Sequence, residues 1–218
     1  MLTIVIPALD AAESLGPCLA ALDGADEIIV VDGGSADATM AIASQEGARV
    51  IMAPRGRGVQ LAAGAREAGG DWLLFLHADT RLGPGWRERV AAHVLNVPDK
   101  AGYFELRLDD PAWQARLIER GVSVRARLFG LPYGDQGLLV SRRLYHQVGG
   151  FRPLALMEDV DLVRRIGRGR LSRLEVIAST SAERWRRDGW LQRSAGNLAC
   201  LALYAAGIAP HRLLRFYR

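Results

Sequence analysis

Three aspartates stand where an apolar segment gives way to polar chain. Asp32 ends the run EIIVVD, Asp79 lies in HADT after the run WLLFL, and Asp159 lies in the acidic segment MEDVD. Ligands of open α/β sheets bind outside the carboxyl ends of the strands, so we expect these carboxylates to line one cleft. Carboxylates in a cleft can hold a divalent cation and accept a proton. Together they predict an enzyme that breaks a bond to a nucleotide diphosphate.

Asp32 and Asp79 are expected to bind different ligands, a nucleoside and a metal ion. Asp32 is followed by two glycines, which permit a tight turn and a close approach of ligand to backbone. We expect Asp32 to accept hydrogen bonds from a nucleoside, with a plain turn before a helix as the alternative. Asp79 suits Mg²⁺ or Mn²⁺ bridging two phosphates. His77, two residues earlier, is expected to be a packing residue.

Two further acidic segments are GDQG at 134–137 and MEDVD at 157–161. Neighbouring carboxylates raise each other's pKa, which helps one of them act as a base near neutral pH. A cluster that only caps a helix is the alternative reading of MEDVD.

Arginine is concentrated in two segments that could meet phosphate. Arg55 and Arg57 alternate with glycines in PRGRG, without the G-K-[ST] of a Walker A loop. In SAERWRR at 181–187, a cation would stabilise a leaving nucleotide and Trp185 could stack on a sugar or acceptor. Surface arginines around an anchoring tryptophan are the alternative. No G-x-G-x-x-G follows the first apolar run, which argues against a dinucleotide dehydrogenase.

The elements expected to position these residues alternate between strand and helix. Short, continuous apolar runs separated by helical segments predict parallel strands buried on both faces, as in a doubly wound α/β fold. The first part has expected strands at 3–7, 27–32, 49–52 and 72–77, and helices at 11–22, 35–45 and 59–68. The second, mixed part has expected strands at 101–108, 137–141 and, at an edge, 174–178, and helices at 84–96, 112–128, 142–148, 160–166 and 190–206.

Composition indicates one packed domain. Half of the 218 residues are apolar, and no run approaches the ~20 apolar residues of a membrane span. Within 1–218 we expect a nucleotide-binding half at 1–100, an acceptor and catalytic half at 101–189, and a helical tail at 190–218. We read no secretory signal at the start, and we expect the two cysteines, Cys18 and Cys200, to be reduced, buried thiols of a cytosolic protein.

Charge is divided unevenly along the chain. The net charge is +4, but 160–218 holds twelve of the 28 basic residues and only four of the 24 acidic ones. This basic part could face nucleic acid, anionic lipid or a phosphorylated substrate, and we expect no nucleic-acid partner. The apolar face of 190–206 is expected to complete the core or a homodimer interface; a membrane surface is the second expectation.

Taken in order, five segments resemble the family 2 glycosyltransferases of the GT-A fold: IVIPALDAAESL, EIIVVDGGSADAT, LLFLHADT, YGDQGLLVSRRLYHQVGGF and MEDVDLVRRI. They are also similar to a small bacterial subgroup with HADT, GDQG and MEDVDL. The resemblance spans about residues 2–190 and implies an inverting transfer from a nucleotide-diphospho-sugar, with a UDP-sugar favoured. It also implies a divalent metal, Mn²⁺ or Mg²⁺. The acceptor is not identified, and the apolar, arginine-bearing C-terminal helix would suit a lipid-linked acceptor at the inner face of the membrane.

The resemblance also implies roles by position. Asp79, at the last position of the family's D-x-D, would bind the metal, and Asp159, the second acid of an E-D pair with Glu158, would be the general base. The implied donor-binding residues are Pro7, Leu9, Asp32, Arg57, Ala78, Arg184 and Trp185, and the acceptor side has Asp135 and Gln136. The chain departs from the family at His77, the first D-x-D position, and at Asp10-Ala11, where asparagine-glutamate is common.

Two other functions stay open on the sequence. A sugar nucleotidyltransferase uses a similar βα half-domain, but it usually has a glycine-rich basic loop where this chain has ALDAAES. A catalytically silent binding module is the third reading, and His77 in place of an acid favours it.

Overall fold

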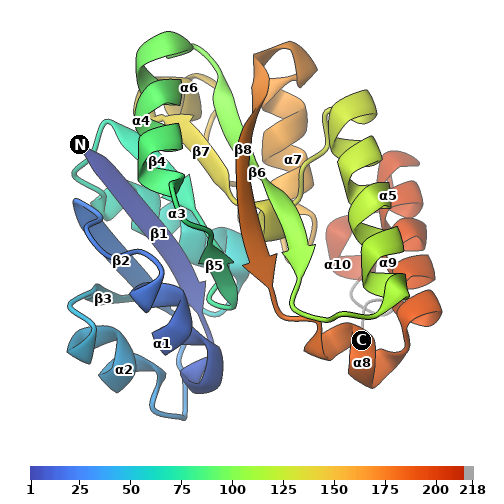
Figure 1. The fold of residues 1–218 in the computed structure, drawn as a ribbon, viewed down its shortest axis with the longest axis horizontal. Coiled ribbons are helices and arrows are strands. Elements are labelled where there is room, and N and C mark those ends of the chain that lie inside the picture. The colour runs from blue at the N-terminus through green and yellow to red at the C-terminus, as the bar shows by residue number, and fades with distance from the viewer. Residues whose placement is uncertain (214–218) are drawn as a thin grey trace.

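The computed structural model describes residues 1–213, and its centre is an eight-stranded mixed sheet flanked by helices (Figure 1). The strand order is β3-β2-β1-β4-β7-β6-β8-β5. This architecture confirms the predicted α/β class, with a doubly wound first part and a mixed second part. The predicted boundary near residue 100 falls inside this one sheet, so the division into two halves remains a functional prediction.

The first part of the chain forms the parallel half of the sheet. Its strands are β1 (Leu2–Ala8), β2 (Glu27–Asp32), β3 (Arg49–Met52) and β4 (Trp72–Phe75). The helices between them are α1 (Ala12–Ala20), α2 (Thr39–Gln45) and α3 (Arg57–Glu67). Strand β1 pairs in parallel with both β2 and β4, and Ala8 lies beside Asp32 at the carboxyl ends. The loops that carry candidate site residues therefore leave the sheet at the same edge.

The central strands of this half, β1 and β4, are almost entirely apolar because helices cover both faces. Ile4 and Ile6 of β1 belong to one buried cluster with residues of α1, whereas Val5 packs in another with residues of α3. Successive side chains of a strand point to opposite faces, so a strand buried on both sides needs an unbroken apolar run. The two cysteines are free and buried, as predicted.

The second part of the chain completes the sheet with mixed pairing. Its strands are β5 (Thr80–Leu82), β6 (Ala101–Leu108), β7 (Leu138–Ser141) and β8 (Leu171–Thr180). Its helices are α4 (Trp86–Asn96), α5 (Trp113–Phe129), α6 (Arg142–Gln147), α7 (Glu158–Ile166), α8 (Glu183–Asp188), α9 (Trp190–Ala205) and α10 (Pro210–Leu213). Strand β7 runs antiparallel to β4, β8 is parallel to β6, and β5 is antiparallel to β8.

The structure corrects three local expectations. The strand expected at the sheet edge is β8, which lies inside the sheet because the short, unpredicted β5 pairs with its far side through Thr80 and Thr180. The helix expected from Ser35 begins at Thr39, since the Ser35 hydroxyl donates to Asp32 at 2.5 Å instead of capping the helix. Helix α8 was not predicted. The end of the helical tail expected at 190–218 forms a helix from Pro210 through Leu213, and residues 214–218 lie outside the described part of the chain.

None of the helices formed by residues 1–213 has the length and apolar character that a membrane crossing requires.

Close packing of α3 on the sheet yields a stability prediction. A Cβ at Gly64 would lie 2.3 Å from Val5 Cγ1 and 2.9 Å from Val31 Cγ2. We expect Gly64→Ala to destabilise the fold by roughly 1–3 kcal/mol, because overpacking outweighs the ~1 kcal/mol gain in helix propensity. Gly121→Ala in α5 is the matched control, since a Cβ there meets nothing within 4 Å and should stabilise slightly. Urea unfolding measures both; equal effects of the two changes would contradict the packing argument.

Candidate active site

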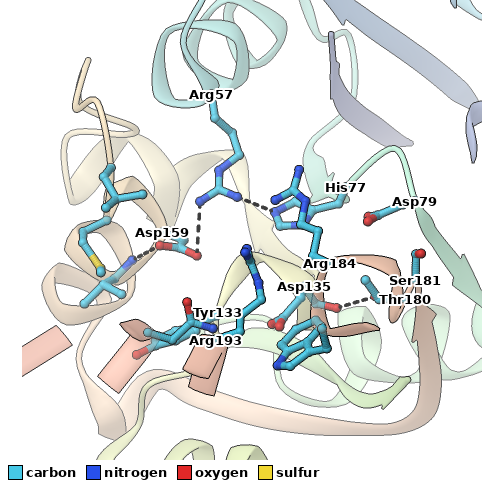
Figure 2. Close-up of a pocket in the computed structure, with 15 residues that line it drawn as sticks. Arg57, His77, Asp79, Tyr133, Asp135, Asp159, Thr180, Ser181, Arg184 and Arg193 are labelled. Atoms are coloured by element: carbon cyan, nitrogen blue, oxygen red, sulfur yellow. Dashed lines mark hydrogen bonds and ion pairs between the residues drawn. The ribbon is translucent and has the colours of Figure 1, made fainter. Parts of the chain in front are cut away.

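Two adjoining hollows lie beyond the carboxyl ends of β1 and β4. The first, the acidic pocket, is lined by Asp79, Asp135 and Asp159 (Figure 2). The second, the strand-end groove, is lined by Pro7, Leu9 and Ala78. The two hollows share five residues, namely Arg57, His77, Asp79, Ser181 and Arg184. They therefore form one continuous depression that holds most of the residues singled out in the sequence.

Asp79 lies in the turn that links β4 to β5. The amide of Thr80 donates to the His77 carbonyl at 3.1 Å, which closes this turn and leaves the Asp79 side chain in both hollows. Burial raises the pKa of Asp79, and the cations of Arg184 and Arg57 oppose that rise. The carboxylate is thus placed where a further positive charge, such as a metal ion, would be stabilising.

Asp159 stands in the first turn of α7 and faces the same pocket. Its Oδ2 accepts the Gly134 amide at 2.8 Å, and its Oδ1 accepts the Val160 amide at 2.8 Å. Arg57 Nη2 lies 4.0 Å from Oδ2. These bonds hold the carboxylate in a fixed orientation toward the pocket, and they tie α7 to the GDQG segment.

Arg57 is the centre of a charge network, and Figure 2 shows it between Asp159 and His77. Its Nε donates to Glu158 Oε1, and its Nη1 lies 3.3 Å from His77 Nε2. The Glu158 side chain is only 1% exposed and lines neither the acidic pocket nor the strand-end groove. Burial raises the pKa of Glu158, with Arg57 opposing. Although predicted as catalytic, Glu158 is placed to position Arg57.

His77 contributes no charge to the site. Burial and the nearby Arg57 lower the pKa of His77 to about 3, so the ring is neutral and its Nε2 accepts from the guanidinium. The residue at the first D-x-D position is therefore a partner of Arg57, as well as a wall of both hollows.

Asp135 and Gln136 have different surroundings, although both were predicted on the acceptor side. Asp135 lines the acidic pocket, and its Oδ1 is buried without a hydrogen-bond partner among the described residues. Gln136 instead donates from Nε2 to the Phe104 carbonyl at 3.1 Å and lines a hollow between β6 and α5. The structure does not bring Gln136 to the acidic pocket, because consecutive side chains of this helical turn point in different directions and that of Gln136 is bonded to β6.

A pH-dependent stability difference should follow from Asp135. Burial raises its pKa to about 6, with Arg125 opposing and Asp159 reinforcing the shift; Arg57 and Asp79 also act on it. A carboxyl group whose pKa is raised in the folded state increases the free energy of unfolding at pH values below its ordinary pKa. This contribution is lost as the pH rises through about 6. In EDTA, Asp135→Asn should therefore gain roughly 2 kcal/mol relative to wild type between pH 4 and pH 8. Urea titrations along this range measure the difference; a constant difference would contradict it.

Asp32 is fully buried and lines neither of the two hollows. Its Oδ1 accepts the amides of Gly34 and Ser35 at 2.8 and 2.9 Å. The Ser35 hydroxyl in turn accepts the amide of Asp10, a groove residue, at 2.9 Å. In the structure Asp32 thus supports the loop that walls the groove, while its direct contact with a nucleoside stays a prediction.

The α8–α9 segment closes the acidic pocket. Arg184 lines both hollows, and Trp185 lines the pocket with its Nε1 buried and lacking a hydrogen-bond partner within residues 1–213. The guanidinium of Arg193 lies 5.7 Å from the centroid of the Trp185 ring. Sequence reasoning missed Arg193, although it is the single charged residue of α9, and it also missed Tyr133 and Thr180 of the pocket wall.

The residues fit a divalent cation only in part. Within residues 1–213, no three His, Cys, Asp or Glu side chains are grouped closely enough to hold a metal ion by themselves. Mg²⁺ and Mn²⁺ commonly bind through one or two carboxylates, with substrate phosphates and water as the other ligands. Asp79 therefore fits a metal ion that binds together with a diphosphate.

Comparison with solved structures gives the class of this fold. TarS 1–349 of S. aureus, in complex with UDP-GlcNAc, has a TM-score of 0.65 at 15% identity, over 83% of this chain and 58% of that one. Glucosyl-3-phosphoglycerate synthase from Mycobacterium tuberculosis, in complex with Mn²⁺, UDP-glucose and phosphoglyceric acid, has a TM-score of 0.60 at 21% identity, over 83% and 70%. The chain has the GT-A fold of glycosyltransferases.

Sequence comparisons agree with this class. Residues 3–103 match the family described as Glycosyl transferase family 2. The chain is 32% identical over 201 residues to a TPR repeat-containing protein of Synechococcus elongatus, covering 84% of this chain and 46% of the relative. It is 33% identical over 93 residues to an uncharacterized glycosyltransferase of M. tuberculosis, covering 42% and 43%. The aligned segments cover less than half of each relative. The N-terminal part of the chain thus matches the family 2 glycosyltransferase sequence, and the chain has a GT-A fold.

Proposed function

We propose that the protein transfers a sugar from a nucleotide-diphospho-sugar, a UDP-sugar first, to a hydroxyl acceptor with inversion at the anomeric carbon. The observation that carries this is the convergence of Asp79, Asp159 and Arg57 on one hollow that continues into the strand-end groove. The likeness to structures solved with UDP-glucose and UDP-GlcNAc supports the choice of donor.

The donor would lie along both hollows. The groove beside Pro7, Leu9 and Ala78 offers backbone and small apolar surfaces to the nucleoside. Arg57 and Arg184 line both hollows and stabilise the two negative charges of the diphosphate. The sugar would then extend into the acidic pocket, next to Trp185.

A divalent metal fits beside Asp79. When bound with the diphosphate, the cation would neutralise charge that develops on the leaving nucleotide. Metal dependence should therefore appear as a coupling: the metal and the nucleotide each bind more tightly in the presence of the other.

Asp159 is the proposed general base. The acceptor oxygen attacks the anomeric carbon, the bond from that carbon to the diphosphate oxygen breaks, and the acceptor proton passes to Asp159. The Gly134 amide and Arg57 orient the carboxylate for this step. Glu158 acts as a positioning residue through its ion pair with Arg57.

Two measurements test this function. A thermal-shift panel of nucleoside diphosphates and nucleotide sugars, each with and without Mn²⁺, should show stabilisation by a uridine nucleotide that grows when metal is added. A product assay with that nucleotide sugar should then show release of the nucleoside diphosphate. Pyrophosphate release from a nucleoside triphosphate and a sugar phosphate would instead indicate a nucleotidyltransferase. Tight nucleotide binding without hydrolysis or transfer would indicate a silent binding module.

A further inference from the structure

Large apolar side chains are exposed mainly at one end of the molecule. Among residues 1–213, twelve large hydrophobic side chains are exposed, and seven of them lie on α5 or α9. These seven are Trp113, Leu117, Val124, Leu128, Phe129, Leu191 and Leu198, with exposed fractions from 51% to 80%. Scattered exposed leucines are ordinary, whereas a concentration on two packed helices marks an interaction surface.

Helix α5 is apolar on two opposite sides. Its inner side holds Ala115 and Val122, which are buried in a cluster with Leu106 and Leu108 of β6. On the outer side, Trp113, Leu117, Val124 and Leu128 follow each other at spacings of four, seven and four residues, which places them in one row along the helix. We call this row the α5 stripe. A helix that only covers a core has a polar outer side, so the stripe needs a partner.

Helix α9 extends the apolar surface. It packs beside α5 at the same end of the molecule (Figure 1). Its inner side buries Cys200, while Leu191 and Leu198 are exposed. After Arg193 the helix carries no charged residue through Ala205. Its exposed surface is therefore apolar over most of its length.

A row of arginines runs alongside the stripe. The row consists of Arg116, Arg120 and Arg127, which each follow a residue of the α5 stripe by three positions. These arginines therefore lie next to the stripe along the same helix. Arg120 and Arg127 are exposed and form no ion pair with residues 1–213. The groove that they line, between α5 and the sheet, also contains Arg107 and Arg173, against only two acids, Glu105 and Glu119. The border of the apolar surface is therefore strongly positive.

We propose that the α5–α9 face docks on the surface of an anionic lipid bilayer. The α5 stripe and the outer side of α9 would enter the boundary between headgroups and acyl chains, and Arg120 and Arg127 would bind lipid phosphates. Charge selects this occupant over a second copy of the chain, because a two-fold contact through α5 would bring the two arginine rows together without acidic partners.

Docking in this orientation places the active site near the bilayer. Arg193 of α9 and Trp185 of α8 both line the acidic pocket. A membrane that contacts the outer side of α9 would therefore be separated from the acidic pocket only by this helix. An acceptor held in the bilayer could be reached without leaving it, although docking itself requires no transfer activity.

Vesicle flotation of the full chain tests the docking. We expect the protein to float with phosphatidylcholine vesicles that contain ~30 mol% phosphatidylglycerol, to float far less with phosphatidylcholine alone, and to be released by ~0.5 M NaCl. Failure to float with the anionic vesicles, or equal flotation with both, would overturn the proposal.

Two double variants locate the contact. Leu117→Gln with Val124→Gln should weaken partitioning roughly 10–100-fold, because two apolar side chains leave the interface. The matched control is Met40→Gln with Leu95→Gln, which removes two exposed apolar side chains from α2 and α4. Arg120→Gln with Arg127→Gln should weaken partitioning to anionic vesicles roughly 10-fold or more, and Arg66→Gln with Arg87→Gln, at exposed arginines of α3 and α4, is its control.

The outcomes separate a membrane from a second copy of the chain. Wild-type partitioning by the stripe variant, with native thermal unfolding, would overturn the proposal. Sedimentation that shows a wild-type dimer and a monomeric stripe variant would assign the face to self-association, and would overturn it too. The native fold of each variant is checked by circular dichroism, so loss of flotation by an unfolded chain is not counted.

Discussion

Replacement of Asp159 by asparagine is expected to lower the turnover of sugar transfer by about 10²–10⁴-fold, while the affinity for UDP stays within about threefold of wild type. The reason is geometric as well as chemical. Asparagine keeps an oxygen that can accept the Gly134 amide, now 2.8 Å from Asp159 Oδ2, so the loop should hold its shape. The amide side chain cannot take the acceptor proton. Steady-state kinetics and calorimetric titration with UDP measure the two quantities.

The control for this change is Asp99→Asn, which removes an exposed carboxylate that pairs with Arg143 at the surface. Its turnover should match wild type. A second comparison is Glu158→Gln, which leaves Arg57 without its buried ionic partner. This variant should weaken donor binding more than Asp159→Asn does, because Arg57 lines both hollows. If Asp159→Asn loses UDP affinity in proportion to turnover, then Asp159 is a donor-binding residue and the assignment as base is wrong.

Asp79→Asn should abolish the metal-dependent part of nucleotide binding and lower turnover on the order of 10³-fold, since a metal ion supplies several kcal/mol of charge stabilisation. Asp79 is the carboxylate that lines both the pocket and the groove. Without its charge the cation would have only the diphosphate and water as ligands. Titration of UDP in the presence of Mn²⁺ and of EDTA measures the coupling, which should be large for wild type and near zero for the variant.

Asp71→Asn is the matched control, because Asp71 precedes the same strand, β4, at its opposite end and its side chain is 87% exposed. This control should keep both turnover and the coupling between metal and nucleotide. A wild-type coupling in Asp79→Asn would show that another group holds the cation. Asp135, which has a buried oxygen without a hydrogen-bond partner in the described chain, would then be the next candidate.

The strands were the most predictable part of the fold. The runs at 27–32, 49–52 and 101–108 are strands with the predicted bounds, because short runs rich in β-branched, aromatic and other apolar residues favour strands. Strand β5 could not be predicted, since three residues carry no periodicity and form a strand only by pairing with β8. The start of α2 was misplaced because Ser35 had a nearer partner in Asp32.

The site residues, like the strands and helices, were predictable where local sequence decides their position and not where tertiary contacts decide it. Pro7, Leu9 and Ala78 line the groove, and Asp79, Asp135 and Asp159 line the pocket, as strand ends and motif positions suggested. Gln136 and Glu158 could not be placed from their motifs, since the direction of a side chain in a short turn or at the start of a helix depends on its tertiary neighbours. Helix α9 was expected as a tail, and its role as a pocket wall depends on how the chain folds back.

The amino-acid sequence by itself determined the alternation of strands and helices, the α/β class, and the type of chemistry that carboxylates and arginines at strand ends can perform. These properties depend on local apolar patterns and on residue type. Only the tertiary structure decided which carboxylates share a hollow, that Arg57 is held between Glu158 and His77, and that the apolar side of α5 faces solvent. Such features depend on contacts between segments up to about a hundred residues apart, which no local pattern records.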